Sequence, residues 1–297
     1  MKNRSLSGII FAITGGIFWG FSGTCGEFIF KHYEVNENWL CSVRILAAGL
    51  ILVAISFIKY RAELFALLKN KLDLLRTVLF GVLGLLLSQY CYLAAISASN
   101  AGTATVLQYL GPVMIMIVTC FSGRRLPRLN EFLALVLAVG GTFLIATHGD
   151  ISTLSINPKA LIFGLLSALG LVFYTMLPSK IIPKYGTIPV LGLGMTASAV
   201  PLFFIIRPYS YEVSLDLAGF AAIAGLILVG TVLAYTVYLM GVDRAGTVKA
   251  SVACSIEPVA AAVFSALWIG SSFTAEDVIG FAAIIAAVII LSLSKKK

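Results

Sequence analysis

The chain has 297 residues, of which 60% are hydrophobic and 11% are charged, and its mean hydropathy is +1.01. A water-soluble domain is rarely more than about half apolar, so this composition excludes one and indicates a protein that crosses a membrane many times. The net charge of +8 lies in short loops between apolar runs, which favours a role in membrane topology over nucleic-acid binding.

Ten apolar runs follow one another along the chain, and each is roughly the twenty residues that an α-helix needs to span a bilayer. Their predicted bounds are 7–30, 38–58, 74–97, 101–121, 131–148, 159–178, 187–206, 217–241, 246–269 and 274–294. Small residues at spaced positions in many of these runs would let the helices approach one another closely. The sequence therefore predicts an all-α membrane protein with ten transmembrane helices.

One stretch of the chain recurs about 146 residues later. Tyr92 and Pro112, twenty residues apart, recur as Tyr238 and Pro258 with the same separation. In both copies an apolar helix is followed by a link of small residues and by a second apolar helix that carries the proline. The predicted links run from Ser97 to Thr105 and from Asp243 to Ser251.

The repeat predicts two five-helix halves, residues 1–148 and 159–297, joined by the segment 148–158. Since five is an odd number, the second half must enter the membrane with the opposite polarity to the first. Inverted repeats of this kind are typical of secondary transporters, whose substrate site lies near the middle of the membrane between the repeats.

The basic residues predict the orientation of the protein in the membrane. With the N-terminus inside, seventeen of the 21 Lys and Arg residues fall on the inner side, among them Lys249 and Lys295 to Lys297, while Arg44 lies within a helix. The outer side receives only Lys31, Lys159 and Arg207. Because basic residues in short loops stay in the cytoplasm, we expect a multi-pass protein of the cell inner membrane with both termini cytoplasmic.

Motifs of other functional classes are missing from the sequence. It contains no Gly-x-x-x-x-Gly-Lys-Ser/Thr loop for nucleotide phosphates and no His-Glu-x-x-His or Gly-x-Ser-x-Gly pattern, so neither ATP hydrolysis nor enzymatic chemistry is predicted. The five cysteines show no Cys-x-x-Cys spacing, and His32 and His148 are far apart. No cofactor and no metal site are therefore expected.

Polar side chains inside apolar helices are costly, and so they mark candidate functional positions. Gln89 and Tyr92 share one face of the third predicted helix, and Tyr235 and Tyr238 hold the equivalent positions in the eighth. These four groups either line a cavity or form hydrogen bonds between helices.

Pro112 and Pro258 each remove an amide donor and displace the carbonyl four residues back, so the helices that carry them are predicted to bend and to take part in gating. Gln108 and Tyr109 shortly precede the first proline. Glu257 precedes the second near the middle of the membrane, where a carboxylate must face water, meet a cation or hold its proton. It is a candidate contact for a substrate amine or a proton site, and a neutral carboxyl bonded to a neighbouring helix is the alternative.

Glu27 and Arg44 lie near the outer ends of the first two predicted helices, in the same leaflet. They are a possible ion pair, which either is structural, with Arg44 extending outward, or is functional, as an outer gate or as an anchor for a carboxylate. Trp19, about two turns below Glu27, is the candidate apolar wall of the cavity in the first helix. Tyr174 in the sixth helix is its candidate aromatic counterpart, and packing between helices is the alternative role for both rings.

Four segments carry a family pattern across almost the whole chain: Trp19-Gly20, Asn38 to Gly49 around Arg44, Ala95 to Met116 with its proline, and Ile256-Glu257-Pro258-Val259 followed by Gly270. In their order and spacing they resemble the drug/metabolite transporter superfamily, specifically its ten-helix EamA-type members. The family commonly has Leu-Gly-Glu after the fourth and ninth helices. This chain instead has Ser122-Gly123-Arg124-Arg125 and Ile269-Gly270-Ser271, so contacts of that glutamate are not expected here.

The resemblance implies a secondary carrier, often an exporter of amino acids or other small metabolites, with a central cavity between the repeats. We predict a transporter rather than an enzyme, whose partners are a small-molecule substrate and the lipid bilayer, with Glu257 as the candidate site of proton coupling; no oligomeric state is indicated. The alternative is a membrane-embedded lipid-handling protein or enzyme, which needs a reactive cluster that the scattered Glu27, Arg44 and Glu257 do not form. The predicted substrate-binding residues are Trp19, Gln89, Tyr92, Gln108, Tyr109, Tyr174, Tyr235, Tyr238 and Glu257. The predicted helix-break and gating residues are Pro112, Pro258, Glu27 and Arg44.

Overall fold

The computed structural model describes residues 2–99, 101–154, 157–270 and 274–293. Within these ranges ten helical stretches are long and apolar enough to cross a bilayer, which confirms the predicted all-α architecture of ten spans. Some residues used in the predictions of the links and of the orientation lie outside the described residues, namely Asn100, residues 155–156, Ser271 and Lys295 to Lys297.

The two halves repeat the same order of helices. The first half contains α1 (Lys2–His32), α2 (Glu37–Lys59), the short α3 (Arg61–Lys69), α4 (Lys71–Leu79), a π-helical segment (Phe80–Leu86), α5 (Leu87–Ala98), α6 (Ala101–Gln108), α7 (Gly111–Ser122) and α8 (Leu129–Thr147). The 3₁₀ turn Ile151–Thr153 follows. The second half contains α9 (Pro158–Met176), a 3₁₀ turn (Pro178–Lys180), α10 (Ile182–Tyr185), α11 (Thr187–Ile206), a 3₁₀ turn (Pro208–Ser210), α12 (Leu217–Ile227), a π-helical segment (Leu228–Leu233), α13 (Ala234–Ala245), α14 (Thr247–Ala253), a 3₁₀ turn (Cys254–Ile256), α15 (Glu257–Ile269) and α16 (Ala275–Leu293).

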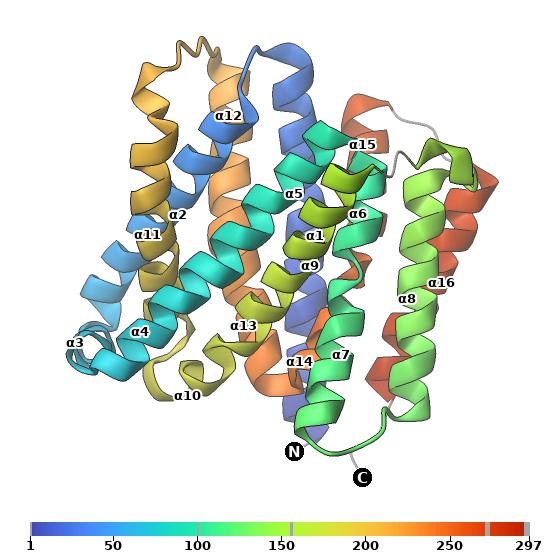
Figure 1. Ribbon diagram of the computed structural model, residues 1–297, viewed down its shortest axis with the longest axis horizontal. Coiled ribbons are helices and arrows are strands. Elements are labelled where there is room, and N and C mark those ends of the chain that lie inside the picture. The colour runs from blue at the N-terminus through green and yellow to red at the C-terminus, as the bar shows by residue number, and fades with distance from the viewer. Residues whose placement is uncertain (1, 100, 155–156, 271–273, 294–297) are drawn as a thin grey trace.

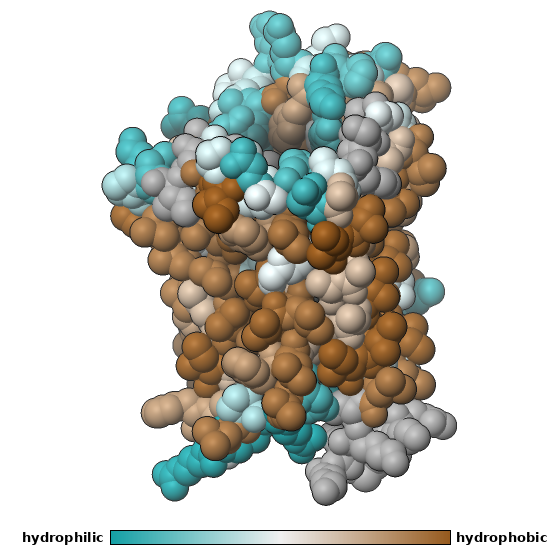
Figure 2. Space-filling model, turned by 90° about the vertical axis from the view of Figure 1, so that its right-hand side faces the viewer, coloured by the Kyte–Doolittle hydropathy of each residue, from teal (hydrophilic) through white to brown (hydrophobic). Residues whose placement is uncertain are grey.

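The surface is divided into an apolar band and two polar ends. On the face drawn in Figure 2, hydrophobic residues cover the middle of the molecule and hydrophilic residues gather at its top and bottom. Helix α1 begins and α16 ends at the same end, where Figure 1 marks N and C. We call this the N/C end and the opposite one the distal end. The apolar band is where the acyl chains of a bilayer would surround the protein.

The first span of each half packs against the other half. Helix α1 lies along α13 and α15, and α9 lies along α5 and α6 (Figure 1). Glycines permit these close contacts: a Cβ on Gly15 would come within 3.1 Å of the Tyr238 Cβ, and one on Gly170 would come within 2.5 Å of the Ser88 backbone nitrogen. Inside a bilayer the hydrophobic effect does not drive helices together, because lipid tails are as apolar as the side chains. Close backbone packing is therefore a main source of helix association there.

The second and fifth spans pair with their own counterparts. Helix α2 packs along α11, the second span of the other half, and α8 packs along α16, the fifth. In the second pair a Cβ on Gly141 would lie 2.7 Å from the carbonyl oxygen of Gly280. The two halves therefore interlock around a shared centre, and each contributes walls on both sides of it.

Both spans that carry the repeated proline are interrupted just ahead of it. Helix α6 ends at Gln108 and α7 begins at Gly111 with Pro112 in its first turn, while the 3₁₀ turn Cys254–Ile256 separates α14 from α15, whose first turn holds Pro258. A proline in the first turn of a helix costs little, because the amide it lacks would have no intrahelical partner there. Each interruption therefore places the proline at the start of a new helix.

The links predicted ahead of these spans are much shorter in the structure. Helix α5 continues to Ala98, and Gly246 alone separates α13 from α14, where its φ of 88° favours glycine. The loop expected to carry Lys249 is correspondingly absent: this lysine belongs to the first turn of α14 and is only 7% exposed. The hydropathy pattern could not separate a one-residue break from a longer link, because small residues suit both.

Two π-helical segments occupy matching places in the third spans of the two halves, Phe80–Leu86 and Leu228–Leu233. Each widens the helix by one residue per turn at the point where it passes a span of the other half. The first passes α11, and a Cβ on Gly81 would collide there with the carbonyl of Gly194. No sequence pattern predicted these segments, which are known mainly as local insertions near functional sites.

Candidate functional site

A cavity of about 690 Å³ lies at the centre of the molecule, between the two halves. Its walls come from α1, α2, α5 and the interrupted span α6–α7 of the first half and from α9, α12, α13 and the interrupted span α14–α15 of the second. The cavity reaches the surface at the distal end, beside the exposed Phe30 and Lys31 and the first turn of α2 at Glu37. Its volume falls within the range of small-molecule sites.

The structure brings together twelve of the thirteen residues that the sequence singled out. The exception is Pro258, which is buried beside the cavity-lining Glu257. The twelve that line the cavity are Trp19, Glu27, Arg44, Gln89, Tyr92, Gln108, Tyr109, Pro112, Tyr174, Tyr235, Tyr238 and Glu257. Their proximity shows a common site, and their roles in binding and gating stay predictions.

An aromatic cluster of Trp19, Tyr174, Tyr235 and Tyr238 forms the deep end of the cavity. The Trp19 ring lies 4.8 Å from the ring of Tyr235, 5.1 Å from that of Tyr238 and 6.4 Å from that of Tyr174, measured between centroids. Edge-to-face contacts at such distances hold rings in fixed relative positions. Tyr238 is only 1% exposed, so this cluster forms a buried floor between the cavity and the part of the protein nearer the N/C end.

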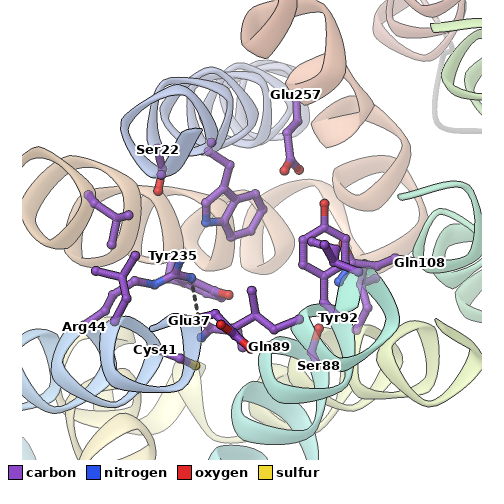
Figure 3. Close-up of a pocket in the computed structure, with 18 of the residues that line it drawn as sticks. Ser22, Glu37, Cys41, Arg44, Ser88, Gln89, Tyr92, Gln108, Tyr235 and Glu257 are labelled. Atoms are coloured by element: carbon purple, nitrogen blue, oxygen red, sulfur yellow. Dashed lines mark hydrogen bonds between the residues drawn. The ribbon is translucent and has the colours of Figure 1, made fainter. Parts of the chain in front are cut away.

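Arg44 and Gln89 form the donor-rich side of the cavity. The Arg44 guanidinium donates to the Gln89 Oε1 atom, a contact drawn as the dashed line in Figure 3. The Nε atom of Arg44 and the Nε2 atom of Gln89 are buried and have no hydrogen-bond partner among the described residues. Buried donors are seldom left unpaired in proteins, so this pair presents unused hydrogen-bonding capacity.

Glu257 supplies the acceptor on another wall. It is the first residue of α15, directly after the 3₁₀ turn, and its backbone N–H donates to the Cys254 carbonyl. The Tyr109 hydroxyl donates to its Oε2 atom at 3.1 Å. In Figure 3 the Glu257 carboxyl group points into the cavity from above, while Arg44 and Gln89 approach from below.

The predicted ion pair between Glu27 and Arg44 is not formed. Glu27 instead pairs with Lys31 at 2.8 Å and accepts a hydrogen bond from Ser265 at 3.1 Å. The two candidates lie at different depths: Glu27 is one helical turn before Lys31 near the mouth, whereas Arg44 turns inward to Gln89. Sequence spacing placed both in one leaflet but could not fix the directions of their side chains.

Hydrogen bonds between helices position the polar residues of the fourth span and its neighbours. The Gln108 Nε2 atom donates to the Ser167 hydroxyl at 2.7 Å, and that hydroxyl donates to the Ser88 carbonyl at 2.9 Å. Tyr92 and Thr105 share a hydrogen bond of 2.9 Å between their hydroxyl groups. These bonds tie α5, α6 and α9 together, and thereby fix one wall.

Toward the N/C end the cavity is closed by a hydrogen bond within the second half and by contacts between the halves. The hydroxyl groups of Tyr238 of α13 and Thr175 of α9 lie 3.0 Å apart below the aromatic cluster. Nearer the end, Thr119 of α7 lies 3.3 Å from Thr247 of α14, and Arg4 of α1 forms a 3.1 Å ion pair with Asp243 of α13. In this conformation the cavity is therefore accessible from the distal end.

Sequence reasoning missed several small lining residues, among them Ser22, Cys41, Ser88, Ser251 and Cys254. Helical spacing carried a signal for three of them, since Ser22 follows Trp19 by three residues, Cys41 precedes Arg44 by three and Ser88 precedes Tyr92 by four. Within the described parts of the chain, no group of three or more His, Cys, Asp and Glu side chains could hold a metal ion.

Comparison with known proteins gives concordant results. Residues 6–147 and 158–293 each match the EamA-like transporter family. The "Uncharacterized inner membrane transporter YicL" of Salmonella typhimurium (strain LT2) is 37% identical over 292 residues, which cover 98% of this chain and 96% of the relative. The "Uncharacterized inner membrane transporter YedA" of Escherichia coli (strain K12) is 23% identical over 273 residues, which cover 87% of this chain and 84% of the relative.

A solved structure, named only "Crystal structure of protein", matches the fold with a TM-score of 0.77 at 15% sequence identity, and the match covers 96% of both chains. At this identity the likeness concerns the arrangement of the helices alone. The sequence relatives and the fold thus point in the same direction.

Proposed function

Because the chain belongs to the EamA-like transporter family, we propose that it is a secondary carrier that moves a small organic metabolite across the inner membrane by alternating access. It is a membrane transporter and not an enzyme. Amino acids and related solutes are the proposed substrates, and export is the proposed direction. The observation that carries the proposal is the central cavity, which is open at the distal end and closed by contacts between the halves at the N/C end.

The proposed orientation places the N/C end in the cytoplasm, so this conformation faces outward. Its supports are the excess of Lys and Arg residues near that end and the preference of such residues for the cytoplasm. Under this proposal, opening toward the cytoplasm requires the Arg4–Asp243 and Thr119–Thr247 contacts to part while the distal mouth closes. The halves 1–148 and 159–297 would then rock against each other around the cavity.

Glu257 is the proposed site of proton coupling or of contact with a substrate amine. It lies in the cavity wall, has no ion-pair partner among the described residues, and stands at a helix break that can move. A carboxyl group that is accessible to the two sides in turn can carry a proton against the substrate.

The test is transport into proteoliposomes of a panel of metabolites, with and without a pH gradient. We expect a subset of amino acids to move in response to the gradient, and Glu257→Gln to abolish this response. Glu63→Gln, an exposed carboxylate on α3 away from the cavity, is the matched control. If Glu257→Gln retains the full response, the proton role is wrong. If no solute in the panel moves, the carrier proposal fails and a lipid-transfer assay takes its place.

A further inference from the structure

Two oppositely charged side chains face the cavity, and neither is neutralised by another protein group. Arg44 of α2 and Glu257 of α15 both line it, and neither has an ion-pair partner within 4.0 Å among the described residues. The other described acidic and basic side chains of the lining are Glu27 and Lys31, which pair with each other, and Glu37 in the first turn of α2 near the mouth. The deep part of the cavity therefore carries one positive and one negative pole.

The positive pole is built to receive an oxyanion. A guanidinium presents five N–H donors in a planar fork that fits a carboxylate. Arg44 uses one of them on Gln89, and the Nε atom and the amide nitrogen of Gln89 remain without acceptors among the described residues. Gln89 is 8% exposed, so its position is set by packing rather than by solvent. Those two nitrogen atoms are themselves covered, so a carboxylate that entered the cavity would accept from the terminal N–H groups of Arg44 that Gln89 does not use.

The negative pole is built to receive an ammonium group. The Glu257 carboxyl group stands at the start of α15 and accepts one hydrogen bond, from the Tyr109 hydroxyl at 3.1 Å, so its other oxygen can accept from an ammonium group. Figure 3 shows Glu257 on the opposite side of the cavity from Arg44 and Gln89, with Tyr235 beside Arg44. The poles are thus separated by open volume and do not collapse into a salt bridge.

The space between the poles is bounded by aromatic rings. Trp19 reaches across toward Tyr235, with 4.8 Å between ring centroids, and the cavity wall has little other charge at this depth. When the cavity closes over a solute with one charge alone, the opposite pole loses its water without gaining a partner, which a desolvated charge tolerates poorly. A solute with both charges satisfies both poles, and its apolar part can lie on the rings.

We propose that the cavity selects zwitterions, holding a carboxylate with Arg44 and Gln89 and an ammonium group with Glu257 and Tyr109, while an apolar side chain rests on Trp19 and Tyr235. The inference rests on the proposed carrier function and deepens it, since it assigns each end of the solute to a wall of the site. It makes Arg44 and Glu257 determinants of specificity with separable effects.

The test uses two sets of three probes that share a side chain and differ in charge. One set is L-leucine, 3-methylbutylamine and 4-methylpentanoate; the other is L-phenylalanine, 2-phenylethylamine and 3-phenylpropanoate. Binding to the purified full-length protein is measured by isothermal titration calorimetry at pH 7. In at least one set, we expect the wild-type protein to bind the zwitterion at least about tenfold more tightly than the amine or the acid. We take this affinity ratio as the smallest that distinguishes a probe bound at both poles from a probe bound at one.

The variants separate the poles. Arg44→Gln loses the preference for the zwitterion over the amine but keeps binding of the amine, and Glu257→Gln loses the preference over the acid but keeps binding of the acid. Arg61→Gln and Glu63→Gln on the exposed α3 serve as matched controls and retain the wild-type order. Thermal unfolding and gel filtration establish that each variant is folded, and Arg44→Lys restores part of the preference if Arg44→Gln fails this criterion.

Three outcomes overturn the inference. The first is a wild-type protein that binds the amine or the acid as tightly as the zwitterion in both sets. The second is a pair of folded variants that lose all three probes equally. The third is transport in proteoliposomes of a solute with one charge or none, with no zwitterion transported; in that case the carrier function stands and the two-pole site does not. If nothing in the panel binds or moves, both proposals are wrong.

Discussion

At the scale of single residues, the two halves share a feature that the sequence analysis overlooked. Glu131 and Asp277, 146 positions apart like the repeated tyrosines, both lie in the first turn of the last span of their half. Glu131 accepts from the Arg128 backbone amide at 3.1 Å and pairs with Arg125 at 2.7 Å, and Asp277 accepts from the Thr274 amide at 2.9 Å. Both carboxylates are nearly fully buried caps of a helix N-terminus.

We expect Glu131→Ala and Asp277→Ala each to lower the free energy of unfolding by about 1 to 3 kcal/mol, because each removes charge-assisted hydrogen bonds to buried groups. Thermal unfolding in detergent measures the effect. Glu63→Ala, at an exposed position, is the control and is expected to leave stability unchanged. Equal stability of all three variants would show that the repeated carboxylates are not structural.

A second residue-scale prediction concerns a contact at the distal end, outside the spans. Tyr33 donates a hydrogen bond to Asp216, which also caps α12 through the Gly219 amide at 2.9 Å. The Tyr33 hydrogen bond is the largest cause that lowers the pKa of Asp216 below its usual value. A lowered pKa in the folded state contributes stability above the unfolded pKa, and this contribution disappears as the pH falls through the folded pKa.

Tyr33→Phe is therefore expected to unfold at a lower temperature than the wild type at pH 6, with the difference shrinking as the pH is lowered below about 3.9, the ordinary pKa of an aspartate. Thermal scans between pH 6 and pH 2.5 provide the measurement. Tyr211→Phe, an alteration of a nearby loop tyrosine, is the control. A difference between Tyr33→Phe and wild type that is independent of pH would contradict this account.

At the scale of elements, the sequence predicted the helix interruptions that a single residue causes. It did not predict the departures from α-helix that depend on packing between helices. Pro112 and Pro258 identified the interrupted spans, since proline acts on its own helix whatever surrounds it. The π-helical segments Phe80–Leu86 and Leu228–Leu233 gave no such signal, because their composition is that of any apolar helix. They arise where two spans approach, and which spans approach is not contained in hydropathy.

The approach of Gly81 to Gly194 provides a test of that explanation. A Cβ at Gly81 would meet the Gly194 carbonyl, which is backbone and cannot rotate away. We expect Gly81→Ala to cost about 1 to 3 kcal/mol of stability through overpacking. Gly140→Ala on α8 is the matched control, since its Cβ would have no atom within 4 Å, and it is expected to be neutral or slightly stabilising. Thermal unfolding of both variants provides the measurement. If Gly81→Ala is as stable as Gly140→Ala, the contact between Gly81 and Gly194 tolerates a side chain and the explanation is wrong.

At the scale of the whole molecule, the number of spans, the two halves and the central position of the polar residues were predictable from the sequence. Trp19 and Tyr174 could be named as facing each other because the repeat implied a shared centre. The partners of Arg44 and Glu27 could not, since their side-chain directions depend on the relative rotation of α1 and α2. The packing of the first span of each half against the other half was likewise not predicted, because the hydropathy of an apolar helix does not say which other helix it contacts.

The orientation in the membrane is the whole-molecule prediction that remains to be measured. Asp150 lies in the segment between the halves, at the distal end, and Glu63 lies on α3 at the other. We expect a membrane-impermeant maleimide added to intact spheroplasts to label Asp150→Cys and not Glu63→Cys. Cys41 and Cys254 line the cavity, so both are replaced by serine before the test cysteines are introduced, and that double variant provides the background for labelling. The opposite labelling pattern would reverse the proposed direction in which the cavity opens.

The packing of α1 against helices of the second half also affects how the chain folds while it is being synthesised. Its main neighbours, α13 and α15, end at Ala245 and Ile269, so they are synthesised more than 200 residues after α1 has emerged. During that interval the first span resides in lipid, or beside the insertion machinery, without its final contacts. The two halves therefore cannot mature one after the other, and native structure is completed only when synthesis has almost ended.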